Sequence, residues 1–398
     1  MPLPVAELTR RLREAADLAA DFAMRAPAHD RDGSFPVENL QILRAAGWAG
    51  LPVPQRWGGW GAGLADAVRL LRTLGGGCGS TALSYAMHVQ TLGTAPARQW
   101  SGDAWPRLCA DVVARGAWVN SCASEPELGS PSRGGLPRTV ARPVAEGWLI
   151  SGRKNFASLA PALDWAIVPA ALAGEDGAIG RFLVPMARLR IEETWDAMGM
   201  RGTGSHDLVL DDAAVGQEAL LYRESAAAPG ARQPVAGAWF TLCFSAVYLG
   251  VADAALAGSA RYALDRVPTA LGKPIGSLEA VQRRLGAADL GLRVAGAFLE
   301  RVAGAWDLAD EAARLDLGAD VVAAKLQVAE AAVSAVDHCL HVLGGPSMRR
   351  DLPLERRFRD VRAVFFHPPT QDQGLALLGR LTLAAAERDA AGAAETGG

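Results

Sequence analysis

The stretch Thr139–Gly152, TVARPVAEGWLISG, decides the fold of this chain. It predicts two short strands around a turn at Glu146-Gly147, because apolar and polar residues alternate on both sides of that turn. Further strand candidates follow, each bounded by Gly, Pro or Asp, at residues 164–172, 181–186, 190–195 and 207–215. No helix-length pattern lies between them. We therefore expect an antiparallel, barrel-like β domain over residues 119–232 rather than βαβ units.

Helical patterns lie on both sides of this domain. Before it, Leu8, Leu12, Ala15, Ala19 and Phe22 recur at three- and four-residue steps, which predicts an amphipathic helix in an N-terminal helical domain, residues 1–118. After it, long patterns rich in Ala and Gly predict a C-terminal four-helix bundle over residues 233–398, with helices at 239–266, 277–307, 319–345 and 372–391 and a frayed tail. The predicted class is therefore α+β.

Length, composition and charge exclude several classes of protein. The chain has 398 residues, half of them apolar, which suits two or three domains with a large core. Forty basic and 43 acidic side chains leave a net charge of −3, which argues against a nucleic-acid partner. Five Cys without a CxxC pair indicate reduced thiols. We expect neither a targeting segment nor a membrane span, and hence a cytoplasmic protein.

Six motifs occur in one order along the chain. They are ASEPELGSP at 123–131, GWLISGRKNFAS at 147–158, MGMRGTGSHDLVLDDAAV at 198–215, YALDRVPTALGKPI at 262–275, HVLGG at 341–345 and ERRFRD at 355–360. Together with the helix–strand–helix order, this series resembles the acyl-CoA dehydrogenase superfamily. The resemblance implies that fold, a bound flavin (FMN or FAD) and a homotetramer with the bundles at its centre.

The same resemblance implies flavin contacts in the first two motifs. Ser124 takes the place of a Thr that meets the flavin pyrimidine edge, and Ser130 belongs to the same motif. Phe156 takes the place of an aromatic that covers one flavin face, and Ser158 that of a Thr near flavin N5. A reactive isoalloxazine needs an apolar cover and fixed donors at its polar edge. The structural alternative is a plain turn of the β domain with a core Phe.

Further contacts are implied nearer the C-terminus. Arg266 is expected to face the flavin phosphate across a subunit boundary, where a guanidinium matches phosphate geometry. Gly344 and Gly345 would let the backbone approach the cofactor closely. Thr370 retains a Thr of the family pattern. The alternatives are a solvated Arg at a helix end and glycines that only end a helix.

The chain departs from the family at the catalytic base. Where acyl-CoA dehydrogenases carry Tyr-Glu-Gly-Thr, this chain reads VRAVFFHPPT at 361–370, with Pro368 in place of Glu and Pro369 in place of Gly. Proline holds no base, so α-proton abstraction cannot proceed as in the family. The other place for a Glu, on the first long helix of the bundle, reads WFTL at 239–242, and that helix also lacks the usual Arg for CoA.

His367 is the remaining proton-handling group at this position. The arrangement resembles the flavin monooxygenase branch of the superfamily, which includes dibenzothiophene and sulfone monooxygenases and amino-sugar nitrososynthases. A histidine suits proton transfer because its pKa lies near 6.5. His88, on a helix that faces the cleft in the family layout, is the second catalytic candidate. The alternatives are a loop histidine held by backbone hydrogen bonds for His367 and a core histidine for His88.

Three functions stay open at this point. The first is a monooxygenase that uses reduced flavin and O2 on the S, N or C atom of a small organic substrate. No GxGxxG follows a strand, so a separate flavin reductase is a possible partner. The second is a dehydrogenase of acyl-CoA or an acyl carrier with a non-standard base, and the third is a non-catalytic flavin scaffold. No metal site is expected, because His338 and His341 lack further ligands around them.

Overall fold

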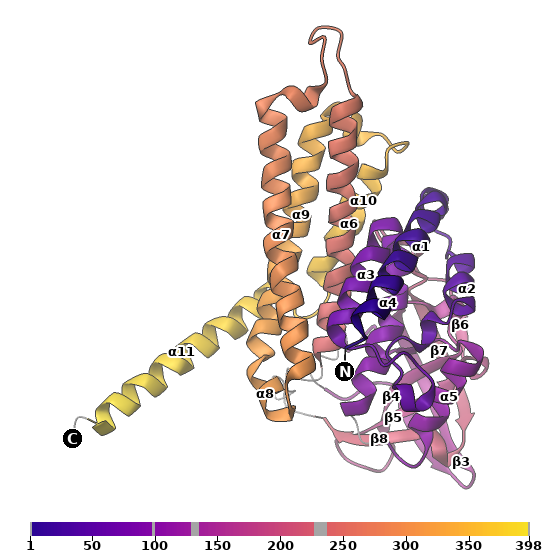
Figure 1. Cartoon of the computed structure of the whole chain (residues 1–398). Helices are drawn as coiled ribbons and strands as arrows, with labels where there is room; N and C mark the ends of the chain where they lie inside the picture. The colour runs from indigo at the N-terminus through magenta and orange to yellow at the C-terminus, as the bar shows by residue number, and fades with distance from the viewer. Residues whose placement is uncertain (1, 98–99, 129–134, 227–236, 397–398) are drawn as a thin grey trace.

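The computed structural model describes residues 2–97, 100–128, 135–226 and 237–396, and within 389–396 only the course of the helix. Helices come first, a sheet second and helices again last, as Figure 1 shows. This order confirms the predicted α+β class.

The first helices pack together, and the first of them buries the apolar face that its three- and four-residue spacing predicted. They are α1 (Val5–Asp32), α2 (Val37–Ala45), α3 (Leu64–Gly77), α4 (Gly79–Thr94) and α5 (Ala104–Arg115). Ala15, Ala19 and Phe22 of α1 are buried against the core, and α1 packs on α3. Helix α4 is buried on nearly every face, because it lies between the outer helices and the sheet.

The described residues form one sheet of eight strands. These are β1 (Val119–Ser121), β2 (Val140–Val144), β3 (Gly147–Ala157), β4 (Trp165–Leu172), β5 (Ala178–Pro185), β6 (Arg190–Glu192), β7 (His206–Val215) and β8 (Leu220–Ser225). The path runs β6-β7-β3-β2-β4-β5-β8, with β1 paired to β4. The β2–β3 hairpin turns at Ala145-Glu146, with Val144 opposite Gly147.

The sheet differs from the expectation in its pairing and its lengths. Strand β4 runs parallel to both β1 and β2, whereas the other pairs are antiparallel. The candidate at 190–195 is a strand only as far as Glu192, and β1 and β8 were not predicted. Alternation along one segment indicates a half-buried strand but carries no information about which strand lies beside it.

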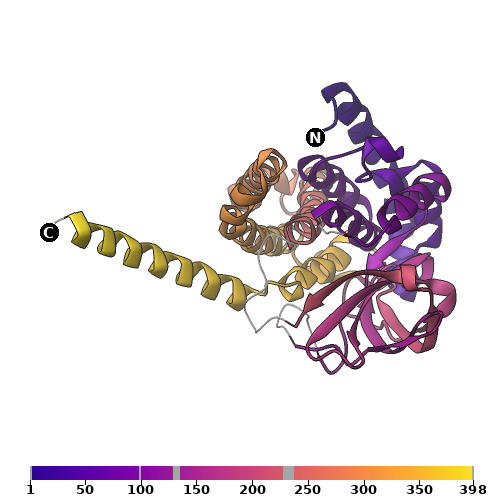
Figure 2. The ribbon, with the colours of Figure 1, turned by 90° about the horizontal axis from the view of Figure 1, so that it is seen from below.

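The C-terminal helices are α6 (Ala238–Asp265), α7 (Glu279–Leu308), α8 (Glu311–Asp316), α9 (Gly318–Leu343), α10 (Pro353–Val361) and α11 (Gln371–Thr396). Helices α6, α7 and α9 lie side by side, and α10 packs on α6 and α9. Helix α11 contacts α9 near its start and then projects away from the other three (Figures 1 and 2). One chain therefore supplies three long helices of the expected bundle, and the last segment is helical rather than frayed.

Helix α6 is the central element of the molecule. It packs on α3, α4, α7 and α9. A Cβ at Gly250 would lie 1.9 Å from the Arg72 carbonyl oxygen, so glycine is required where α6 crosses α3. Among the described residues, α6 alone is long and apolar enough for a membrane span, but 72% of its most apolar window is buried inside the fold. Core packing therefore accounts for its composition.

Candidate functional site

His367 lies in an aromatic cluster at the end of the 3-10 turn Arg362–Phe366. Its ring stacks on Phe244, with centroids 4.6 Å apart and planes at 24°, and Phe240 meets it edge-on at 6.1 Å. The Tyr248 hydroxyl lies 2.8 Å from His367 Nε2. The three aromatic residues come from α6 at four-residue spacing, so they form one stripe on that helix. The stripe fixes both the plane and the direction of the imidazole.

The environment of His367 keeps its ring neutral. Burial, together with the nearby charge of Lys325, lowers its pKa to about 4. Burial also raises the pKa of Tyr248 well above its ordinary value, so the phenol keeps its proton. His367 Nε2 is the acceptor available to that proton among the described residues, which assigns the remaining ring proton to Nδ1. His367 thus presents an N–H donor at Nδ1.

Lys325 is an unusual neighbour of this cluster. It lies on α9, its side chain is 0% exposed, and Nζ has no hydrogen-bond partner among the described residues. Burial lowers its pKa to about 8. An unpaired buried ammonium is costly, so a position that retains one calls for an explanation beyond packing. Sequence reasoning missed Lys325 and Tyr248, although the aromatic spacing on α6 was a usable signal for the latter.

The structure brings Ser124, Phe156 and Ser158 together at one edge of the sheet. The Ser124 carbonyl accepts a hydrogen bond from the Asn155 backbone N–H at 3.0 Å, which ties the two motifs side by side. Phe156 is 63% exposed and has a φ of +53°, a strained backbone for an aromatic residue. Ser158 Oγ lies 2.8 Å from Ser205 Oγ.

This edge fits the polar and apolar sides of an isoalloxazine. Phe156 offers an uncovered aromatic face, held edge-on by Trp195 at 6.0 Å. Asn155 Oδ1 is buried and has no hydrogen-bond partner among the described residues, so it is a free acceptor beside the two serines. An exposed ring next to hydroxyl groups, which can donate, and an unpaired amide oxygen, which accepts, suits the apolar face and polar edge of a flavin.

A buried ion pair connects the two segments that form this edge. Lys154 Nζ lies 2.6 Å from Glu125 Oε1, and both side chains are 0% exposed. Glu125 also accepts hydrogen bonds from Thr139 and from the Arg138 backbone N–H. The pair therefore joins β3 to the segment that carries Ser124. Glu125 had no predicted role, because its partner Lys154 lies 29 residues away in the sequence.

The other flavin candidates lie at the ends of the C-terminal helices. Arg266 is exposed directly after α6. Gly344, with a φ of +65°, ends α9, and a Cβ on Gly344 or Gly345 would meet nothing within 4 Å in this chain. Thr370 directly precedes α11, and its backbone N–H donates to Gln373. Ser130 lies outside the described residues. These positions face open space around one chain, so their cofactor roles stay predictions.

His88 is packed differently from His367. It is fully buried in α4, its Nδ1 accepts from the Val119 backbone N–H at 3.1 Å, and its Nε2 lies 2.9 Å from the Ala49 carbonyl oxygen. Burial lowers its pKa to about 4. Both ring nitrogens are therefore engaged by the backbone. His88 joins α4 to β1 and shares no contact residue with His367, so we give it no proton-transfer role.

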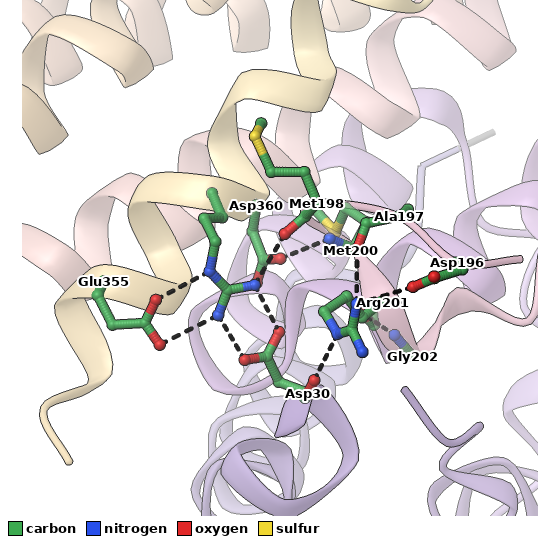
Figure 3. Close-up of polar contacts among 11 residues, drawn as sticks. Asp30, Asp196, Ala197, Met198, Met200, Arg201, Gly202, Glu355 and Asp360 are labelled. Atoms are coloured by element: carbon green, nitrogen blue, oxygen red, sulfur yellow. Dashed lines mark hydrogen bonds and ion pairs between the residues drawn. The ribbon is translucent and has the colours of Figure 1, made fainter. Parts of the chain in front are cut away.

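The motifs MGMRG and ERRFRD meet at a junction of α1, the segment before β7, and α10 (Figure 3). Arg359 of α10 lies 2.5 Å from Asp30 of α1 and 2.8 Å from Glu355. Asp360 Oδ1 accepts from the Met200 backbone N–H at 2.6 Å. The Met200 carbonyl in turn accepts from the Trp195 indole at 3.1 Å. This chain of contacts links the Phe156 edge to the helix that precedes His367.

Comparisons with known proteins place these features in context. Three family models match in order: acyl-CoA dehydrogenase N-terminal domain at residues 7–104, middle domain at 120–213 and C-terminal domain at 242–371. YdbM of Bacillus subtilis, a candidate acyl-CoA dehydrogenase, is 37% identical and spans 89% of this chain and 92% of its own length. L-evernosamine nitrososynthase of a Micromonospora species is 31% identical, over 92% of this chain and 88% of that protein.

A solved structure agrees over nearly the whole length. KijD3, in complex with FMN and a dTDP-linked amino sugar, has a TM-score of 0.82 at 28% identity. The match covers 96% of this chain and 95% of KijD3. Similarity therefore extends to proteins named for two different reactions.

Proposed function

This chain belongs to the acyl-CoA dehydrogenase family of flavin-dependent oxidoreductases, and from that membership we propose that it is a monooxygenase. It would use reduced flavin and O2 to oxygenate the S, N or C atom of a small organic substrate. One observation carries the proposal: at the position of the family's catalytic Glu the site offers Pro368, preceded by a neutral histidine held by Tyr248. When bound, the reduced flavin supplies the electrons that activate O2.

The described residues have separate tasks in this proposal. Phe156 covers one face of the flavin, while Ser124, Ser158 and the Asn155 amide bind its polar edge. Tyr248 holds the tautomer in which His367 Nδ1 carries the proton. That N–H donates a hydrogen bond to an oxygen atom of O2 or of the substrate. Stacking on Phe244 keeps the donor aimed at one point, which is how a single hydrogen bond contributes to catalysis.

A dehydrogenase is the second candidate, and its support is the 37% identity to YdbM. That reaction needs a base strong enough to remove a proton next to a thioester. His367, with a pKa of about 4 and its Nε2 occupied by Tyr248, is a weak base. No carboxylate of the described residues hydrogen-bonds to it. The chemistry of the site therefore favours oxygenation.

The proposal includes partners. A separate flavin reductase would deliver the reduced cofactor. A homotetramer would place Arg266, Gly344 and Gly345 against a neighbour's flavin and would cover α11. FMN and FAD both remain within the proposal, and KijD3 was crystallised with FMN.

One experiment separates the two reactions. The protein is loaded with FMN or FAD and reduced anaerobically, in one arm by NADH and a flavin reductase, in the other by a panel of acyl-CoAs. Labelled O2 is then admitted with organic sulfides and amines, and products are analysed by mass. We expect one labelled oxygen atom per product in the first arm. Bleaching of the flavin by an acyl-CoA would instead establish the dehydrogenase.

Variants of His367 test its role within that assay. We expect His367→Ala to lower oxygenation at least about 100-fold, the size of one general acid–base or oxyanion contact, while flavin binding is retained. His341→Ala is the matched control, because that histidine is exposed on α9. Full activity of His367→Ala would remove His367 from the mechanism.

A further inference from the structure

A cavity of about 350 Å³ lies at the junction of α1, residues 197–201 and α10. Five arginines line it: Arg31, Arg201, Arg350, Arg356 and Arg359. We call it the arginine pocket. Its walls come from the N-terminal helices, the β domain and the C-terminal helices. None of its lining residues belongs to the Phe156 edge or to the His367 cluster, so it is a second site.

Two of the five arginines are held by the protein itself. Arg359 lies between Asp30 and Glu355 and also donates to the Met198 carbonyl. Arg201 donates to the backbone carbonyls of Asp30 and Ala197 at 2.7 and 2.9 Å. The carboxylates of Asp30 and Glu355 are thereby neutralised. These two carboxylates and the two arginines form one hydrogen-bonded side of the arginine pocket.

The other three arginines have no such partner. Arg31 and Arg350 are exposed, and neither forms a hydrogen bond or ion pair with another described residue. Arg356 is 8% exposed, and its Nη1 is fully buried without a partner among the described residues. The last carboxylate of the lining, Asp351, lies 2.5 Å from Arg349. The pocket therefore has an excess of positive charge.

Arg356 is the observation that points to a ligand. Asp360 lies on the same helix, but its Oδ1 accepts from the Met200 backbone N–H, and no ion pair joins it to Arg356 among the described residues. A guanidinium that is more than nine-tenths buried is normally hydrogen-bonded, because buried N–H donors without acceptors cost free energy. An anion in the pocket would supply the missing acceptors.

We propose that the arginine pocket binds the phosphoryl group of a small phosphorylated molecule. Planar guanidinium groups pair with phosphate oxygens two bonds at a time, and three unpaired ones converge here. Exposed Met198 and the neighbouring Leu352 add an apolar wall beside the charges, which suits an organic ester better than a bare ion. The site takes its N–H donors from three domains, so an occupied pocket stabilises their arrangement.

Calorimetry and thermal unfolding of the flavin-loaded protein test the site. The flavin is bound first so that its own phosphate position is filled. Inorganic phosphate and a nucleoside diphosphate are then titrated at constant ionic strength, with chloride as the reference salt. We expect saturable binding and a raised melting temperature for either phosphate ligand, with the organic ester binding more tightly. Equal shifts with chloride would overturn the proposal.

Matched variants locate the binding. Arg350→Ala and Arg31→Ala lie on the surface and leave the fold intact, and each should weaken phosphate binding about tenfold, one charge-assisted hydrogen bond. Arg356→Met should abolish it. Arg283→Ala, exposed on α7 and paired with Glu279, is the control and should bind as the wild type does. If Arg266→Ala removes binding while Arg350→Ala and Arg31→Ala do not, phosphate occupies the flavin site and the proposal fails.

Discussion

At the scale of single residues, the site depends on Lys325, a buried positive charge with no ion-pair partner among the described residues. Lys325 is buried and His367 is half-buried, and the charge of Lys325 adds to desolvation in lowering the His367 pKa to about 4. A histidine that accepts the Tyr248 proton at Nε2 while it donates from Nδ1 must stay neutral at working pH. An unpaired lysine beside it secures that state more firmly than burial alone. The free-energy cost of burying Lys325 is thus connected to the neutral state of His367.

Replacing Lys325 by Met should raise the pKa of His367 from about 4 towards its ordinary value of 6.5, because the repulsion is removed while burial remains. Below that raised pKa the ring becomes charged, so the acid limb of the activity profile should move to higher pH. Nitrogen-15 NMR of the histidine rings measures this pKa without substrate or flavin.

Lys273→Met is the matched control for that titration, because Lys273 is exposed on a loop after α6. An unchanged His367 pKa in Lys325→Met would show that Lys325 does not control the protonation of His367. The same substitution should stabilise the fold at neutral pH. Folded Lys325 releases its proton near pH 8 and the unfolded chain near 10.5, so wild-type stability rises with pH across that interval.

At the scale of elements, most helices and strands were predictable, whereas their partners were not. The alternation in Thr139–Gly152 defined β2 and β3, and the spacing of Ala15, Ala19 and Phe22 defined α1. The parallel pairing of β4 and the projection of α11 depend on contacts between distant segments, which periodicity does not encode. Phe156 and His367 were reached through family motifs. Lys325 was not predicted, because a lysine in a helical pattern is normally assigned to the solvent-exposed face of the helix.

The buried Lys154–Glu125 pair joins two of those elements, and breaking it should affect both stability and cofactor binding. Glu125→Gln removes the counter-charge of buried Lys154 and leaves its Nζ with the Pro169 carbonyl, which should lower the free energy of unfolding by about 3 kcal/mol. Ser124 would lose its fixed position beside β3, so flavin affinity should fall as well. Urea unfolding and flavin titration measure the two effects.

Glu146→Gln is the matched control for this element, because Glu146 is exposed in the β2–β3 turn. It should leave stability and flavin affinity unchanged. A Glu125→Gln variant as stable as this control would show that the ion pair contributes nothing to the sheet edge.

At the scale of the whole molecule, α11 is the helix that a single chain leaves without packing partners along most of its length. It extends away from the body of the protein and exposes Leu375, Leu381 and Leu383, the last by 66% (Figure 2). A helix gains most of its stability from packing an apolar face, and an isolated one is marginal in water. A second copy of the chain is the cover that fits the proposed homotetramer.

Charges on the exposed leucines of α11 should therefore break the assembly. In Leu381→Glu/Leu383→Glu, each substitution removes about 2 kcal/mol of apolar burial and places a carboxylate at the contact. We expect the wild type to elute with the mass of a tetramer in light-scattering chromatography and the double variant with a smaller mass. Flavin should be lost with the assembly, because Arg266 would face no neighbour. Met24→Glu, exposed on α1, should leave the mass unchanged. A monomeric wild type would contradict the proposed assembly, and a tetrameric double variant would exclude α11 from its contacts.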